Sequence, residues 1–260
     1  MPFTGSHPAA VLPFVRSGLV PSALVIGSMA PDLPYFLPGP FSATTTHTLA
    51  GAVTVDVLVG GVAFGVWQAV LAPFAIALAP AALRDRIDDR LPRGLAFHLR
   101  RPRRVALLAA SLALGAATHV VWDSFTHLAR WGPRHIAWLT EVHAGLPGYR
   151  WAQYLSGLVG GAALVVWFAH WWYTSTPRRR AGAWPAPIPR PVAYAICALI
   201  AFATVAGGLL GARPYLHESG PYVTAFLVAT RGGGVGLLTA LACALCWLAL
   251  PRPHDLAGRV

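Results

Sequence analysis

The chain has 260 residues, of which 56% are hydrophobic and 11% are charged, and its mean hydropathy is +0.56. Soluble domains carry roughly 25% charged residues, so this composition excludes an ordinary soluble enzyme and indicates an integral membrane protein. All 20 basic residues are arginine, and the net charge is +11.

The first 48 residues are apolar, but proline, glycine and Arg16 interrupt them repeatedly. We expect short helices here, buried against a helical bundle or lying in the membrane interface. The sequence leaves open whether residues 8–30 cross the bilayer. Three polar residues stand out against this apolar background, namely His7, Asp32 and His47.

Five later segments have the length of about 20 mostly apolar residues that a spanning helix needs. They are residues 49–78, 105–121, 154–173, 192–210 and 222–250. The sequence therefore predicts an all-α, polytopic integral membrane helical bundle of about five transmembrane helices plus short N-terminal helices. We expect a single membrane domain over residues 1–250, in which residues 1–48 form a motif region and residues 49–250 the five-helix bundle. Residues 251–260 are expected to form a cytoplasmic tail.

The arginines predict the orientation of the chain in the membrane. Residues 84–104 hold eight of them, residues 177–190 hold four and the tail holds two, and five crossings place all of these on one side. Cytoplasmic loops carry an excess of arginine, so this side is predicted to be cytoplasmic. Aromatic residues are not interleaved with these arginines, which favours membrane lipids over nucleic acid as partners.

The stretch THVVWDSFTH places His119, Asp123 and His127 four residues apart, at the end of the second apolar segment. Helical residues four apart share one face, so these side chains project together if the helix continues past Ser124. Imidazole nitrogens and a carboxylate are a common ligand set for zinc and similar ions. The alternative is that they are polar residues at a helix end on the membrane surface.

His7, Asp32 and His47 lie on the same, outer side as this stretch in the predicted topology. Ionisable groups buried in a membrane bundle are costly and are usually paired or functional. A bound divalent metal would offset that cost. Two further charges, Asp56 and Arg231, lie at matched depths inside the first and fifth segments, and we expect them to pair.

Four motifs, SHPAAVLPF, SALVIGSMAPDLPYFL, THTLAG and HVVWDSFTH, resemble a bacterial integral-membrane family known as domain of unknown function 4184. More distantly, the order of His and Asp residues is similar to that of membrane-bound metal-dependent hydrolases and zinc-dependent phospholipase C. This similarity implies a helical fold whose His and Asp residues bind zinc and cleave phosphoesters. The residues that match are His7, Asp32, His47, His119, Asp123 and, less closely, His127, with Asp32 and Asp123 expected to be catalytic.

The expected function is therefore a metal-dependent hydrolase of a phosphoester or lipid-linked substrate, in the bacterial cytoplasmic (inner) membrane. Its cofactor is expected to be a divalent metal, with zinc favoured, held by one or two metal positions at the outer face. Arg130, Arg134 and Arg150 would bind a phosphate or lipid headgroups. A small transporter, supported by the buried charges, and a non-catalytic membrane scaffold are the alternatives.

Overall fold

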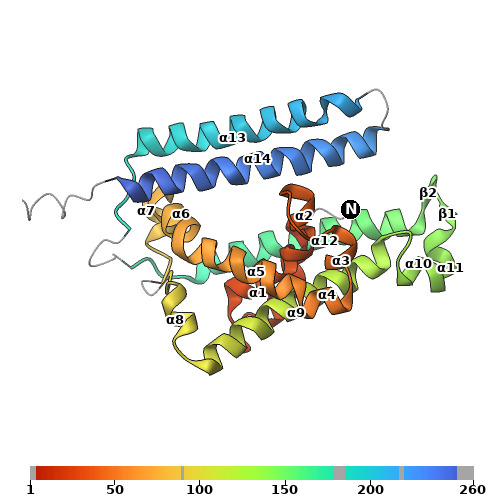
Figure 1. The fold of residues 1–260 in the computed structure, drawn as a ribbon, viewed down its shortest axis with the longest axis horizontal. Helices are drawn as coiled ribbons and strands as arrows, with labels where there is room; N and C mark the ends of the chain where they lie inside the picture. The colour runs from red at the N-terminus through yellow and green to blue at the C-terminus, as the bar shows by residue number, and fades with distance from the viewer. Residues whose placement is uncertain (1–3, 89–90, 179–184, 217–219, 251–260) are drawn as a thin grey trace, which may run out of the picture. The chain divides into compact units, whose positions relative to one another are not determined.

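The computed structural model describes residues 4–88, 91–178, 185–216 and 220–250 (Figure 1). Within these ranges the only strands form a short antiparallel hairpin, β1 (Val142–His143) with β2 (Leu146–Pro147). Almost all other regular structure is helical, and five helical stretches are long and apolar enough to cross a membrane. The prediction of an all-α, polytopic membrane fold is confirmed.

The spanning stretches agree closely with the predicted ones. They are Val55–Leu78, formed by α5 (Val55–Val66), the π-helical turn η3 (Trp67–Leu71) and α6 (Ala72–Leu78); α9 (Pro102–Thr126); α12 (Gly148–Thr174); Arg190–Tyr215, formed by α13 (Arg190–Ala212) and the 3₁₀ turn η4 (Arg213–Tyr215); and α14 (Pro221–Ala249). The first begins six residues later than expected, because the backbone breaks at Thr54 and separates α4 (Leu49–Val53) from α5.

The chain divides into two compact units. Unit 1 contains Met1–Gly65 and Leu95–Thr176, and unit 2 contains Val66–Gly94 and Pro177–Val260. Whether these two units form one membrane domain over residues 1–250, as predicted, depends on how they are joined. The single domain therefore stays a prediction. The expected cytoplasmic tail, residues 251–260, lies outside the described residues. Asp56 belongs to unit 1 and Arg231 to unit 2, so their pairing also remains a prediction.

The motif region of unit 1 consists of short helices, as predicted. These are the 3₁₀ helix η1 (Thr4–Phe14), α1 (Pro21–Met29), the 3₁₀ turn η2 (Ala30–Asp32), α2 (Leu33–Phe36), α3 (Ala43–Thr46) and α4. Prolines cannot donate a main-chain hydrogen bond, and Pro8 and Pro13 lie inside η1. A side-chain cap begins α4, where the Thr48 hydroxyl accepts from the Gly51 main-chain N–H at 2.8 Å.

Unit 1 is built on the crossing of α1 and α9, which Figure 1 shows side by side. Glycines allow this close approach, because a Cβ atom added to Gly27 would lie 2.3 Å from the main-chain oxygen of Leu112. A Cβ added to Gly115 would likewise meet the oxygen of Leu24 at 2.3 Å. The helix η1 packs against α1, α9 and α12, and thereby brings the start of the chain against the second and third spanning stretches.

The remainder of unit 1 and unit 2 can be described briefly. In unit 1, α8 (Leu95–Leu99) precedes α9, and α10 (Trp131–His135), α11 (Ala137–Thr140) and the hairpin connect α9 to α12. In unit 2, α7 (Ala81–Arg84) follows α6, and α13 packs along α14 (Figure 1). Glycines again allow this contact, since a Cβ on Gly232 would lie 2.5 Å from the Thr204 main-chain oxygen.

Candidate metal centre

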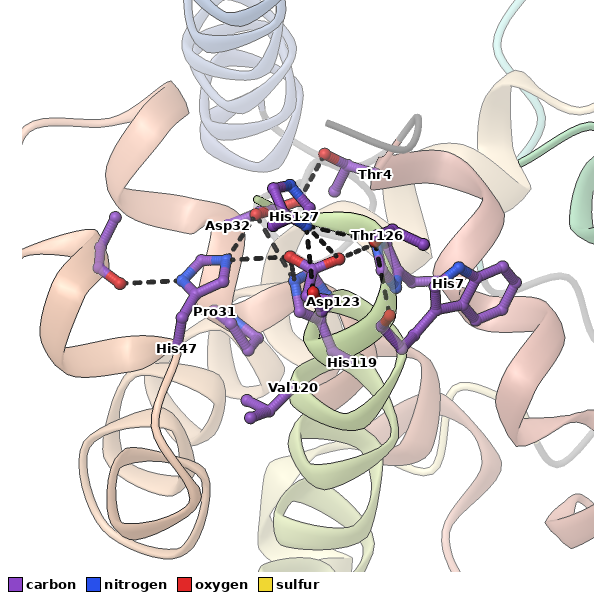
Figure 2. A network of polar contacts seen from close by, with 12 residues as sticks. Thr4, His7, Pro31, Asp32, His47, His119, Val120, Asp123, Thr126 and His127 are labelled. Carbon is purple, nitrogen blue, oxygen red and sulfur yellow. Dashed lines mark hydrogen bonds and ion pairs between the residues drawn. The ribbon is translucent and has the colours of Figure 1, made fainter. Parts of the chain in front are cut away.

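All six residues that the sequence analysis selected as ligands meet in unit 1 (Figure 2). They come from separate segments: His7 from η1, Asp32 from η2, His47 from the residue after α3, His119 and Asp123 from α9, and His127 from the residue after α9. Five of them are at most 4% exposed, while the side chain of His127 is 26% exposed. The four-residue spacing on α9 thus places its side chains as predicted.

His119 is held in place by the crossing of α1 and α9. Its Nδ1 atom lies 2.8 Å from the main-chain oxygen of Ser28 at the end of α1. A carbonyl oxygen only accepts, so Nδ1 carries the proton and donates. The Nε2 atom of His119 therefore faces the cluster, and it has no hydrogen-bond partner among the described residues.

His47 is fixed in the same manner by its own helix. Its Nδ1 atom lies 2.9 Å from the Ala43 main-chain oxygen, so this nitrogen also donates and Nε2 faces the cluster. The Thr46 hydroxyl donates to the Pro31 oxygen at 2.8 Å and ties α3 to the turn that carries Asp32. Arg130, which was expected to bind phosphate or lipid, donates instead to the main-chain oxygen of His47 at 2.7 Å.

Both Nε2 atoms point at the same two carboxylates. The His47 atom lies 3.1 Å from Asp32 Oδ1 and 3.5 Å from Asp123 Oδ2. The His119 atom lies 3.5 Å from Asp32 Oδ1 and 3.4 Å from Asp123 Oδ2. Four donor atoms, one from each residue, lie within 4.8 Å of one another. Neutral imidazoles would place lone pairs against carboxylate oxygens here, and this group of four residues could hold a metal ion at its centre.

These separations fit a divalent metal ion. Zinc binds His nitrogen and carboxylate oxygen at about 2.0–2.2 Å, which puts neighbouring ligands of a tetrahedron about 3.3–3.6 Å apart. The four His–Asp distances of 3.1–3.5 Å are close to that range. The buried donor set of two imidazoles and two carboxylates therefore suits a metal such as zinc, although its geometry does not select zinc over similar ions.

The protonation states of two residues outside the spanning helices also suit metal binding. Burial, together with the neighbouring His119, lowers the pKa of His7 to about 3, so His7 is neutral near pH 7. Burial alone would raise the pKa of Asp32. The neighbouring His119 and His47 side chains and the Thr4 hydroxyl outweigh it and hold the pKa of Asp32 well below its usual range. Neutral imidazole and ionised carboxylate are the forms that bind metals.

His7 and His127 approach the other oxygen of the Asp123 carboxylate. The Nε2 atom of His7 lies 3.6 Å from Asp123 Oδ1, and the His7 ring stacks on that of His119 with centroids 3.8 Å apart. The Nδ1 atom of His127 lies 3.5 Å from the same oxygen. Asp123 thus lies among all four histidines of the cluster, as Figure 2 shows.

One residue of the centre was missed by the sequence analysis. The Thr4 hydroxyl donates to Asp32 Oδ2 at 2.6 Å and leaves Asp32 Oδ1 for the cluster. A 3₁₀ helix has three residues per turn, so Thr4 and His7 share one face of η1. This spacing would have found Thr4 if the segment had been recognised as a 3₁₀ helix.

Other polar residues of the predicted outer loop lie away from the ligand atoms. His135 and His143 stack on Trp131 and Trp138, and each makes a hydrogen bond to a main-chain oxygen of the loop. Arg150 lies over the Tyr149 ring. These contacts are those of loop residues.

The fold and the site define a multi-pass helical membrane protein with a buried His/Asp group that could hold a metal ion. Comparison with curated proteins and with solved structures gave no match. The chain belongs to the family described as "Domain of unknown function (DUF4184)", whose model matches residues 1–246. The resemblance to this family is confirmed, whereas the more distant similarity to metal-dependent hydrolases, and the bacterial origin, stay expectations.

Proposed function

We propose that this protein is a membrane-embedded, metal-dependent hydrolase that cleaves a phosphoester or a lipid-linked substrate. The observation that carries the proposal is the pair of Nε2 atoms, on His47 and His119, each facing Asp32 and Asp123 inside a buried site. Main-chain oxygens fix both imidazoles in this orientation. Such preorganisation by hydrogen bonds behind the ligands is typical of metal sites.

A divalent metal held by these residues would lower the pKa of a bound water and polarise a phosphoryl oxygen. The chain's own residues would supply charge balance, the orientation of the ligands and contacts to the substrate. Asp32 and Asp123 would balance the charge of the ion, and Thr4 donates a hydrogen bond that orients Asp32. Arg130 fixes the main chain at His47, and Arg134 is the proposed contact for a substrate phosphate.

The surroundings of His127 support a lipid-linked substrate. His127 is the partly exposed member of the cluster, so a substrate would approach from its side. The large apolar side chains next to it are exposed: Leu128 is 58% exposed and Trp131 is 53% exposed. Apolar and aromatic side chains of this kind contact acyl chains and the membrane interface. A phosphoester headgroup at the ligands with its acyl chains along these residues is therefore the proposed binding mode.

The test uses the full chain, purified in detergent, for which bound metal and hydrolysis are both measured. Substrates are a chromogenic phosphodiester and phospholipid vesicles. We expect about one or more zinc or manganese ions per chain, and loss of both metal and hydrolysis in Asp123→Asn and Asp32→Asn. His135→Gln, outside the cluster, is the matched control. A wild-type protein without stoichiometric metal, or full hydrolysis in both Asp variants, would overturn the proposal.

Ion-coupled transport is the second candidate, because of one buried group. Asp56 lies in the first spanning stretch, is fully buried, and neither of its oxygens has a hydrogen-bond partner within the described part of unit 1. Intramembrane carboxylates often mark ion pathways. Ion flux into proteoliposomes that is lost in Asp56→Asn, in a protein that binds no metal, would favour transport. Wild-type behaviour of both Asp56→Asn and Asp123→Asn would favour a scaffold.

A further inference from the structure

The two ends of α9 differ in character. Its last turns carry His119 and Asp123 of the candidate metal centre, while its first residues include Arg103 and Arg104. We call these the ligand end and the arginine end. The arginine end is the one that the charge distribution predicts to be cytoplasmic, and α8 precedes it (Figure 1). The depth of any segment that packs along α9 can be measured from these two ends.

The helix α1 runs parallel to α9 and leads toward the ligand end. At its start, the main-chain N–H of Val20 donates to the Ser111 hydroxyl oxygen at 2.9 Å. At its end, His119 donates to the main-chain oxygen of Ser28 at 2.8 Å. The partners in both bonds are 91 residues apart, so the two helices keep one register from residue 20 to residue 28, which is about 12 Å. Asp32 follows α1 through η2 and thereby reaches the ligand end.

The helix η1 begins at the same end of α9 and leads away from it. His7, near its start, stacks on His119 with ring centroids 3.8 Å apart. From His7 to Phe14, a 3₁₀ helix rises about 14 Å, which matches the length of the α1 leg. A turn over residues 15–18 joins η1 to α1, and η1 packs against both α1 and α9. Residues 4–32 therefore form a hairpin with both of its ends at the ligand end.

The turn of this hairpin lies deep within the thickness of the membrane. Ser111, which binds the start of α1, is about 18 Å from Asp123 along α9 and about 14 Å from Pro102. It is therefore past the middle of α9, in the half nearer the arginine end. Val20 packs against the same group of buried side chains as Leu95, which belongs to α8 at the arginine end. Because the hydrocarbon core of a bilayer is about 30 Å thick, the hairpin passes through most of it.

The turn is polar and exposed, since Arg16, Ser17 and Gly18 all lie at the surface of the protein. Irregular backbone does not occur exposed to lipid tails, because no water is present there to satisfy its N–H and C=O groups. A guanidinium group is also costly in hydrocarbon, and its long side chain extends to the interface. We infer that residues 4–32 enter the membrane from the ligand end and return to it, and that their turn contacts the phospholipid headgroups at the arginine end.

This re-entrant hairpin brings residues from both of its legs to the candidate metal centre. Thr4 and His7 come from the first leg and Asp32 from the second. Residues 8–30 then do not cross the bilayer, and the described chain begins on the same side of the membrane as the centre. The hairpin needs no bound metal, so it stands apart from the proposed function.

Single cysteines in the full chain report the face of the membrane that each position reaches. The native cysteines are first replaced by alanine, and Ser17→Cys is then added at the turn. Two matched variants mark the faces: Ala129→Cys, in the exposed loop after α9, and Arg100→Cys, exposed just before α9. A membrane-impermeant maleimide is applied to each face of sealed vesicles, and a protease-cleavable tag before Met1 is digested from each face.

We expect Ser17→Cys to react from the same face as Arg100→Cys, and the tag to be cleaved from the same face as Ala129→Cys. Cleavage of the tag from the Arg100 face would mean that residues 4–32 cross the bilayer, and would overturn the hairpin. A Ser17→Cys protein that reacts only from the Ala129 face, or only after detergent is added, would overturn the headgroup contact. Arg16→Cys repeats the measurement at the same turn, and elution like that of the wild type in gel filtration shows that each variant is folded.

Discussion

His119 and Ser28 are 91 residues apart in the chain, yet the imidazole Nδ1 of the first donates to the main-chain oxygen of the second at 2.8 Å. This bond spans the crossing of α1 and α9, where the glycine contacts bring the two backbones together. The orientation of a ligand thus depends on how closely two helices pack. A substitution that separates α1 from α9 should therefore weaken metal binding as well as the packing of unit 1.

Gly115→Ala tests this dependence. The added Cβ atom would lie 2.3 Å from the Leu24 main-chain oxygen. A main-chain atom cannot avoid this clash by changing rotamer, so α1 must move away from α9. We expect a loss of about 1–3 kcal/mol in the free energy of unfolding, with weaker metal binding. Gly61→Ala in α5 is the matched control, because a Cβ there meets nothing within 4 Å. That control should be neutral or stabilising by about 0.4–1 kcal/mol. Equal melting temperatures for the two variants would contradict the argument.

Thr4→Val removes the hydroxyl that orients Asp32 and keeps the shape of the side chain. The Asp32 carboxylate loses its 2.6 Å hydrogen bond and can rotate, so metal affinity should fall about 10–100-fold. Competition with a chromogenic chelator measures this change in the dissociation constant. Thr140→Val serves as the control, since the Thr140 hydroxyl bonds only to the main-chain oxygen of Ala137 in an exposed turn. An unchanged affinity in Thr4→Val would show that Thr4 has no part in the site.

The pH dependence of stability should carry a contribution from His7. In the metal-free protein its pKa is lowered to about 3 from 6.5, because burial disfavours the charged ring. Below pH 6.5 the unfolded chain therefore binds a proton here that the folded chain does not, and stability falls as the pH falls. The slope is at most about 1.4 kcal/mol per pH unit, and it ends near pH 3. His7→Gln removes this contribution.

The measurement is the unfolding midpoint of wild type and His7→Gln between pH 7 and pH 4, with a chelator present throughout. The wild type should lose stability relative to the variant as the pH falls through this window. Two curves that stay parallel would mean that His7 gains a proton equally easily in the folded and unfolded chain.

Asp56 and Arg231 provide a test of how the two units are joined. The single substitutions Asp56→Asn and Arg231→Gln should each destabilise the protein if these residues pair, since each leaves a charge unpaired inside the membrane. The double substitution should then cost less than the sum of the two, with a coupling of about 0.5–3 kcal/mol. Additive effects in this cycle of unfolding measurements would exclude the ion pair.

The spanning stretches and the ligand residues could be predicted from sequence because each depends on a short-range pattern. Apolar runs of membrane length lie at the five observed positions, and the placing of His119 beside Asp123 follows directly from the helical repeat. His127 illustrates the limit of this reasoning. The helix α9 ends at Thr126, so His127 reaches Asp123 from extended backbone and not from the helix face.

The features that could not be predicted depend on contacts between distant segments. Nothing in the local sequence of α9 shows that His119 will donate to Ser28, or that Arg130 will bind the main chain of His47. The break at Thr54 was also missed, because residues on both sides are equally apolar. Sequence patterns identified the side chains of the centre, and tertiary packing decides how their nitrogens are oriented.

The place of η1 beside α9 has a consequence for biosynthesis. Thr4 and His7 leave the ribosome long before His119 and Asp123, since more than a hundred residues and one complete spanning stretch lie between them. The residues of η1 can pack against α1 early, but their contacts with α9 form only after the second spanning helix has entered the bilayer. The ligand set of the proposed metal centre is therefore complete only after α9 has been inserted.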